Sequence, residues 1–211
     1  MLAGLVNRFS GFIAGMAAMF SGAALIFTIL MRQPLWLTLT VLGFFAASAF
    51  AVVWAFLPQE RRAHFLVLIK VGFISGVVAT ILYDFSRWLL VTLTGWNFWP
   101  FKTFPIFGRL IAGEHLDLAT AYAVGTVYHI VNGLLFCVAY CLIFGRRHIG
   151  WAVAWALVLE SAVLLLYPGW LGLDKIMAEF TAVSIIGHVC FGLGLGFTSN
   201  KLLPVHRLHS G

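Results

Sequence analysis

Long apolar runs follow one another along almost the whole of this 211-residue chain. A helix needs about 20 apolar residues to cross roughly 30 Å of hydrocarbon. The sequence therefore predicts an all-α fold, a polytopic membrane helix bundle. With 62% hydrophobic and 9% charged residues, the composition excludes an ordinary soluble domain. The six predicted transmembrane helices cover about 10–31, 35–57, 65–93, 118–144, 150–167 and 180–199.

We expect one membrane domain over 1–211, made of an N-terminal helix hairpin (1–57) and a four-helix core (65–200). The first span resembles a signal peptide, but its apolar run continues past any small-residue cleavage site, so we expect it to be retained. Pro34 closes the hairpin. The loop 95–117 of the core is rich in aromatic residues, and we expect it to lie along the membrane surface, or to cap a site beneath it.

The basic residues divide unequally between the two ends of the predicted helices. One end has the single acid Glu60, and its basic residues are Arg8, Arg61, Arg62, Arg146, Arg147, Lys201 and Arg207. The other end has as many acidic as basic residues. By the positive-inside rule the first end is cytoplasmic, which puts both termini inside and favours the bacterial inner membrane. The net charge of +6 then reflects topology and does not indicate a nucleic-acid surface.

A few ionisable residues fall inside the predicted spans, where they are costly unless they face a cavity or a partner. Asp84, His129, Glu160 and His188 come from four different helices. At 1.5 Å per residue, all four lie about 10–16 Å from the loop end of their helix. We therefore expect them to meet in one layer. Arg87, one turn after Asp84, is predicted to pair with it locally.

Two interpretations of this layer remain open at this point. His129 paired with Glu160 or Asp84 as a structural polar contact is as good an explanation as metal ligation. Asn132 is predicted to bond to a neighbouring helix.

Glycines accompany both histidines on their helical faces. Gly125 and Gly133 lie four residues either side of His129, and Gly192 lies four after His188. Such a face can admit a flat macrocycle or a second helix. Two histidines suit a haem, and two histidines with carboxylates suit a metal ion. We therefore predict that these glycines contact a cofactor. The predicted ligands are His129, His188, Glu160 and Asp84.

The stretch YHIVNGLLFCVAYCL, followed by a fifth apolar span and then EFTAVSIIGHVCFGLGLG, resembles the YagU-like inner-membrane proteins over about residues 66–197. Glu160 has no counterpart in the pattern of that family. The resemblance implies the same fold, two important histidines and a role in acid tolerance, and it names no activity. The matching positions are His129, Tyr140, Cys141, Glu179, Gly187 and His188.

Three functions follow from these patterns. The first is an intramembrane site that binds a metal ion or haem, in redox chemistry or within a membrane enzyme complex. The second is a proton or ion transporter that uses the same residues as a relay. The third is an accessory or assembly subunit of a membrane complex. Besides the lipid bilayer, the expected partners are other membrane subunits or a second copy of the chain.

Overall fold

The computed structural model describes residues 2–204, and this part of the chain is all-helical, as predicted. The elements are α1 (Leu2–Ala18), α2 (Phe20–Met31), α3 (Leu35–Phe56), α4 (Gln59–Thr94), α5 (Phe104–Ala112), α6 (Leu118–Phe144), α7 (Ile149–Leu171), the short 3₁₀ helix η1 (Asp174–Ile176) and α8 (Met177–Leu202).

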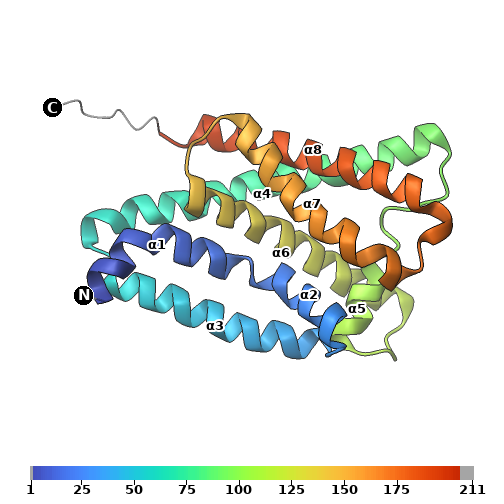
Figure 1. The fold of residues 1–211 in the computed structure, drawn as a ribbon, viewed down its shortest axis with the longest axis horizontal. Helices are drawn as coiled ribbons and strands as arrows, with labels where there is room; N and C mark the ends of the chain where they lie inside the picture. Colours follow the sequence, from blue (N-terminus) through green and yellow to red (C-terminus); the bar gives the residue numbers. More distant parts are fainter. Residues whose placement is uncertain (1, 205–211) are drawn as a thin grey trace.

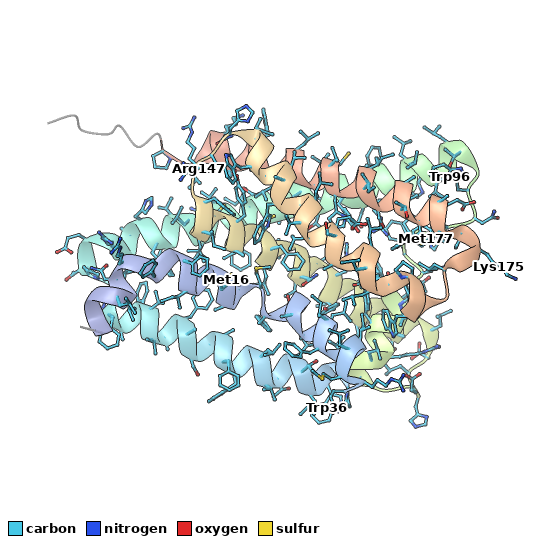
Figure 2. The ribbon with its side chains drawn as sticks, in the orientation of Figure 1. Met16, Trp36, Trp96, Arg147, Lys175 and Met177 are labelled. Atoms are coloured by element: carbon cyan, nitrogen blue, oxygen red, sulfur yellow. The ribbon has the colours of Figure 1, made fainter. Side chains whose placement is uncertain are left out.

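The long helices run side by side as one bundle (Figure 1). Helix α1 begins and α8 ends towards the same end of it, together with the turns at 57–58 and 145–148, and we call this end the terminal face. The opposite end, the loop face, has the turn at 32–34, the segment 95–117 and the turn at 172–176. In Figure 2, Arg147 lies towards the terminal face, whereas Lys175 and Trp96 lie at the loop face. The predicted position of Arg207 falls outside the described residues.

Five helices are long and apolar enough to cross a membrane, and α1 with α2 supplies a sixth crossing if the bent pair is one span. The chain is therefore a multi-pass membrane protein, and large apolar side chains such as Phe44, Leu93 and Leu165 point out of the bundle, where lipid would lie. The sidedness of the bundle stays a prediction.

The first predicted span is broken near its middle. Helices α1 and α2 meet at Met19 with a bend of 49°. Ser21 and Gly22 lie two and three residues after Met19, and such pairs are a common cause of kinks. The hydroxyl of Ser21 donates to Asn132 Oδ1 at 2.7 Å, and the Tyr128 hydroxyl donates to the Ser21 carbonyl at 3.0 Å. Two side chains of α6 thus form hydrogen bonds with the segment just after the break. The predicted interhelical bond of Asn132 is confirmed.

Helix α6 is the centre of the terminal half, because glycines of two helices pack directly against it. A Cβ on Gly11 of α1 would overlap the carbonyl of Leu142. A Cβ on Gly72 of α4 would lie 2.6 Å from Val138 Cα, and one on Gly76 would lie 2.8 Å from Leu134 Cα. These contacts are close helix crossings of the GxxxG kind.

Helix α7 packs mainly along α8, and α8 also packs along α4. Towards α2, α7 makes few close backbone approaches. This one-sided attachment leaves space between α7, α2 and α6 in the loop half of the bundle.

Candidate functional site

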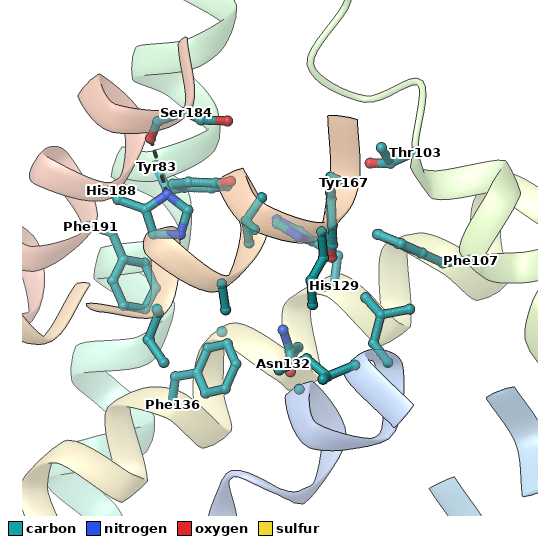
Figure 3. Close-up of a pocket in the computed structure, with 18 of the residues that line it drawn as sticks. Tyr83, Thr103, Phe107, His129, Asn132, Phe136, Tyr167, Ser184, His188 and Phe191 are labelled. Carbon is teal, nitrogen blue, oxygen red and sulfur yellow. Dashed lines mark hydrogen bonds between the residues drawn. The ribbon is translucent and has the colours of Figure 1, made fainter. Parts of the chain in front are cut away.

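A cavity of about 410 Å³ fills that space, with walls from α2, α4, α5, α6, α7 and α8 and from the end of α1 (Figure 3). Most of its lining is apolar and aromatic, including Phe107, Phe136 and Phe191. Polar groups are few, and His129 and His188 are among them. An apolar hollow of this size with a few convergent polar groups is typical of a small-molecule site.

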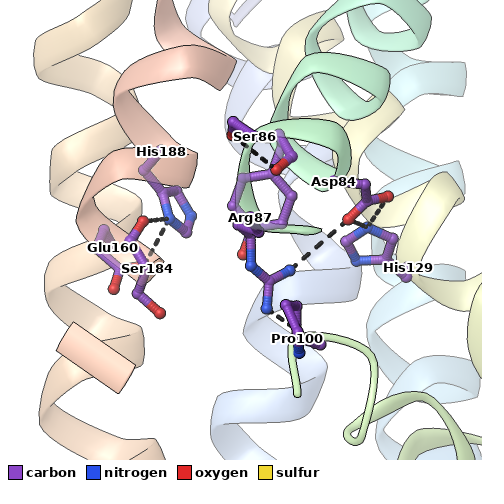
Figure 4. A network of polar contacts seen from close by, with 9 residues as sticks. Asp84, Ser86, Arg87, Pro100, His129, Glu160, Ser184 and His188 are labelled. Carbon is purple, nitrogen blue, oxygen red and sulfur yellow. Dashed lines mark hydrogen bonds and ion pairs between the residues drawn. The ribbon is translucent and has the colours of Figure 1, made fainter. Parts of the chain in front are cut away.

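The first polar pair joins α4 and α6. His129 Nε2 lies 3.1 and 3.0 Å from the two carboxylate oxygens of Asp84. Arg87 Nη1 is 3.7 Å from Asp84 Oδ1, which confirms the predicted local ion pair. The Asp84 carboxylate therefore has a cation on one side and an imidazole on the other (Figure 4). Its charge is compensated even when the imidazole is neutral.

The second pair joins α7 and α8, and its carboxylate is more buried than that of the first pair. His188 Nδ1 lies 2.6 Å from Glu160 Oε2 and 3.0 Å from the carbonyl oxygen of Ser184. One Nδ1–H can point at only one of these acceptors, and in the described part of the chain neither Glu160 oxygen has a well-aligned hydrogen bond. Glu160 is 1% exposed. The short contact therefore places a buried carboxylate directly beside an imidazole.

Tyr83 connects the two pairs. Its ring centroid is 5.8 Å from that of His129 and 4.9 Å from that of His188. The guanidinium of Arg87 lies 4.5 Å from the same ring centroid. The four ionisable residues predicted to share a layer are thus brought together as two neighbouring pairs, and both carboxylates stand behind their imidazoles relative to the cavity.

This arrangement bears on the predicted metal ligands. In residues 2–204 no group of three or more His, Cys, Asp or Glu side chains is placed to hold one ion. His129, His188, Glu160 and Asp84 form two separate pairs, so a metal would have at most two of them at either position. For a haem, the nitrogens not engaged by carboxylates, His129 Nδ1 and His188 Nε2, are the ones left as ligands, and Tyr83 contacts both rings.

The glycines predicted to contact a cofactor pack against neighbouring helices instead. A Cβ on Gly125 would overlap the Phe104 carbonyl of α5, and one on Gly133 would overlap the Thr80 hydroxyl of α4. A Cβ on Gly192 would lie 2.6 Å from Val153 Cα of α7. Of the two occupants that these faces could admit, these packing contacts support a second helix. Gly133 also reaches the cavity wall.

The aromatic segment 95–117 covers the loop end of the cavity, as the capping alternative predicted. Phe98, Thr103 and Phe104 line the cavity from above. Two contacts fix the segment: Arg87 Nη2 donates to the Pro100 carbonyl at 2.9 Å, and Glu179 accepts the backbone N–H of residues 97 and 98 at 2.7 and 2.9 Å. We call residues 95–103 the cover. Arg87 thus joins the cover to the Asp84–His129 pair.

Three parts of the site escaped the sequence analysis, and the first is helix α5, which lies within the predicted loop and lines the cavity with Phe104 and Phe107. Tyr83 stands directly before Asp84, but its contact with both imidazoles depends on how α4 faces α6 and α8. The break at Met19 was hidden by an unbroken apolar run, and Ser21–Gly22 was the only local signal of it.

No family model, curated protein or solved structure matches this chain. The resemblance to YagU-like proteins stays a prediction.

Proposed function

We propose that this protein is a proton-linked membrane carrier for a small, largely apolar molecule, with the cavity as its binding site. The observation that carries the proposal is that two imidazoles, each backed by a carboxylate from another helix, face one cavity at the break in a membrane-spanning segment. Carboxylate and imidazole groups inside membranes commonly form proton relays.

The two pairs suit this work because a carboxylate behind an imidazole stabilises the protonated ring and fixes its orientation. A proton taken up by His188 from the cavity side is balanced by Glu160. On the other wall, Asp84 does the same for His129, with Arg87 holding Asp84 in place. A ligand that can donate or accept one hydrogen bond would form that bond with one of these rings.

The broken helix supports movement as well as binding. Interrupted membrane helices occur where backbone lines a cavity, and in carriers they mark binding sites. Met16, Met19 and Gly22 all line the cavity around the bend. A hinge at Met19 would let α2 move against α7 without disturbing the contact of α1 with α6.

The ligand chemistry follows from what faces the cavity. Arg87 is the charged side chain in its lining, since both carboxylates lie behind histidines. The aromatic walls favour an apolar body, and Arg87 with the imidazoles favours an oxygen-bearing or weakly acidic end group. A lipophilic weak acid fits this description.

Proton flux into liposomes with an entrapped pH dye tests the proposal directly. Purified wild type, driven by a potassium diffusion potential, should show flux that depends on pH, and His129→Ala and His188→Ala should each lower it by about tenfold. His148→Gln is the matched control, because His148 is an exposed histidine at the start of α7. Folded wild-type protein without pH-dependent flux would refute the carrier.

A haem or metal centre is the second proposal, favoured by one observation: both imidazoles face the same cavity with a ring nitrogen not bound to a carboxylate. Metal analysis with a visible spectrum on detergent-purified protein tests it. A Soret band or stoichiometric metal, lost in both histidine variants, would support it. Colourless, metal-free protein would leave the carrier.

A further inference from the structure

A second hollow, of about 750 Å³, lies at the loop face where the α2–α3 turn meets α5 and α7, and we call it the surface groove. It differs from the cavity in lining, although Leu166 borders both. The residues that matter for the argument are Arg32, Arg109, Ile29, Trp36, Trp170 and Glu114.

Two arginines line the surface groove together with one carboxylate, that of Glu114. Within residues 2–204, the ion pairs closer than 4.0 Å involve neither Arg32 nor Arg109. The Nε of Arg109 is buried and has no hydrogen-bond partner in that range. Buried donors are nearly always satisfied, so the unpaired Nε–H of Arg109, a residue that lines the groove, calls for an acceptor. Glu114 is exposed at the rim and leaves the groove with an excess of one positive charge.

Beside the polar side chains of Thr28 and Gln33, the groove has an apolar and aromatic part. Trp36 is the second residue of α3 and Trp170 the last but one of α7, and the Trp170 ring stacks on Phe107 with centroids 6.4 Å apart. Tryptophan at the end of a membrane helix marks the depth of lipid headgroups. Ile29 and Leu166 continue the groove towards the hydrocarbon. A ligand here would meet cations at its outer end and apolar side chains at its inner end.

We propose that the surface groove binds a phospholipid, with Arg32 and Arg109 donating to the phosphodiester oxygens and an acyl chain along Ile29 and Leu166. Guanidinium groups match phosphate geometry and form strong charge-assisted hydrogen bonds with it. Free phosphate shares the headgroup chemistry, but it would leave the apolar part of the groove uncovered. The site is independent of the proposed transport.

Native mass spectrometry of the detergent-purified full chain, titrated with dioleoyl phosphatidylglycerol, tests the proposal. Wild type should hold one lipid more tightly than the rest. Arg32→Gln and Arg109→Gln should each weaken that binding by about tenfold, the loss of one charge-assisted contact. Arg32 lies exposed in a turn, so its variant should fold normally. Lys175→Gln, at the same face but outside the groove, is the matched control and should bind as wild type does.

Two further ligands decide the chemistry. Dioleoylglycerol has the same chains without phosphate, and it should bind at least about tenfold more weakly than the phospholipid. Inorganic phosphate in large excess should not displace the lipid. Equal binding by Arg32→Gln and wild type, equal binding of dioleoylglycerol, or displacement by inorganic phosphate would each overturn the proposal, and the last would show a free-phosphate site.

Discussion

The two halves of the bundle are built in opposite ways. In the terminal half, glycines bring α1 and α4 into backbone contact with α6, and Cys137, Ala139 and Cys141 are completely buried. In the loop half, a bent helix and a one-sided α7 leave a hollow with two carboxylate–imidazole pairs. Close packing supplies most of the stability of a membrane bundle, whereas buried ionisable groups are costly. The terminal half therefore supplies most of the stability of the bundle, whereas the loop half contains the destabilising ionisable groups of the candidate site.

The sharpest test of this division is Glu160→Gln in the loop half. The amide keeps the size of the side chain but cannot take up the proton, so flux should fall by at least about tenfold. The thermal unfolding temperature should change little, since no well-aligned hydrogen bond is lost. Glu60→Gln, in the first turn of α4, is the control. If unfolding temperature fell as steeply as flux, Glu160 would be a structural residue and the division would fail.

The opposite result is expected in the terminal half for Gly72→Ala combined with Gly76→Ala. Each added methyl would press on the backbone of α6, and together they should destabilise the protein by about 3 kcal/mol. Thermal unfolding in detergent measures the loss. Gly169→Ala is the matched control, because its Cβ would meet no atom within 4 Å. Equal unfolding temperatures for the double variant and the control would show that the α4–α6 contact can relax.

A third test concerns the cover of the loop half. Arg87→Lys keeps the charge near Asp84, but its shorter side chain cannot bond both Asp84 and the Pro100 carbonyl. The amides of residues 97–103 should then exchange hydrogen about tenfold faster, which mass spectrometry of the peptides would detect. Peptides from the terminal half serve as the internal reference and should not change. Unchanged exchange in the cover would mean that Glu179 alone holds it.

The smallest effect is expected at the start of α6. The Thr120 hydroxyl and backbone N–H donate to Asp117 and hold the pKa of that carboxyl below its usual range. A lowered pKa in the folded state stabilises the helix end above the usual aspartate pKa, and the effect is lost as pH falls through the lowered value. Amide protection at Thr120 should therefore drop below about pH 4. Asp117→Asn should abolish this pH dependence, and a persistent dependence would point to another group.

The sequence predicted the membrane-spanning helices well because run length alone decides whether a segment can span a membrane, but it did not predict the short helix α5. It also singled out the ionisable residues that form the two pairs, since charge inside a span is rare. Their pairing was left open, because helical rotation decides that His129 meets Asp84 and His188 meets Glu160. Depth along a helix can be counted from the sequence, but the direction in which a side chain points depends on neighbours. For the same reason the sequence could not decide whether the glycines face a macrocycle or a second helix, and in the structure α5, α4 and α7 pack against them.

The one-sided attachment of α7 has a consequence for how such a protein could change. Its residues Leu159, Ala162 and Leu166 form one wall of the cavity, yet its backbone is held mainly by α8. Substitutions on that wall would alter the shape offered to a ligand while sparing the glycine contacts that hold the other helices on α6. Ligand selectivity could therefore change through substitutions in α7, while the packing of the remaining helices stays the same.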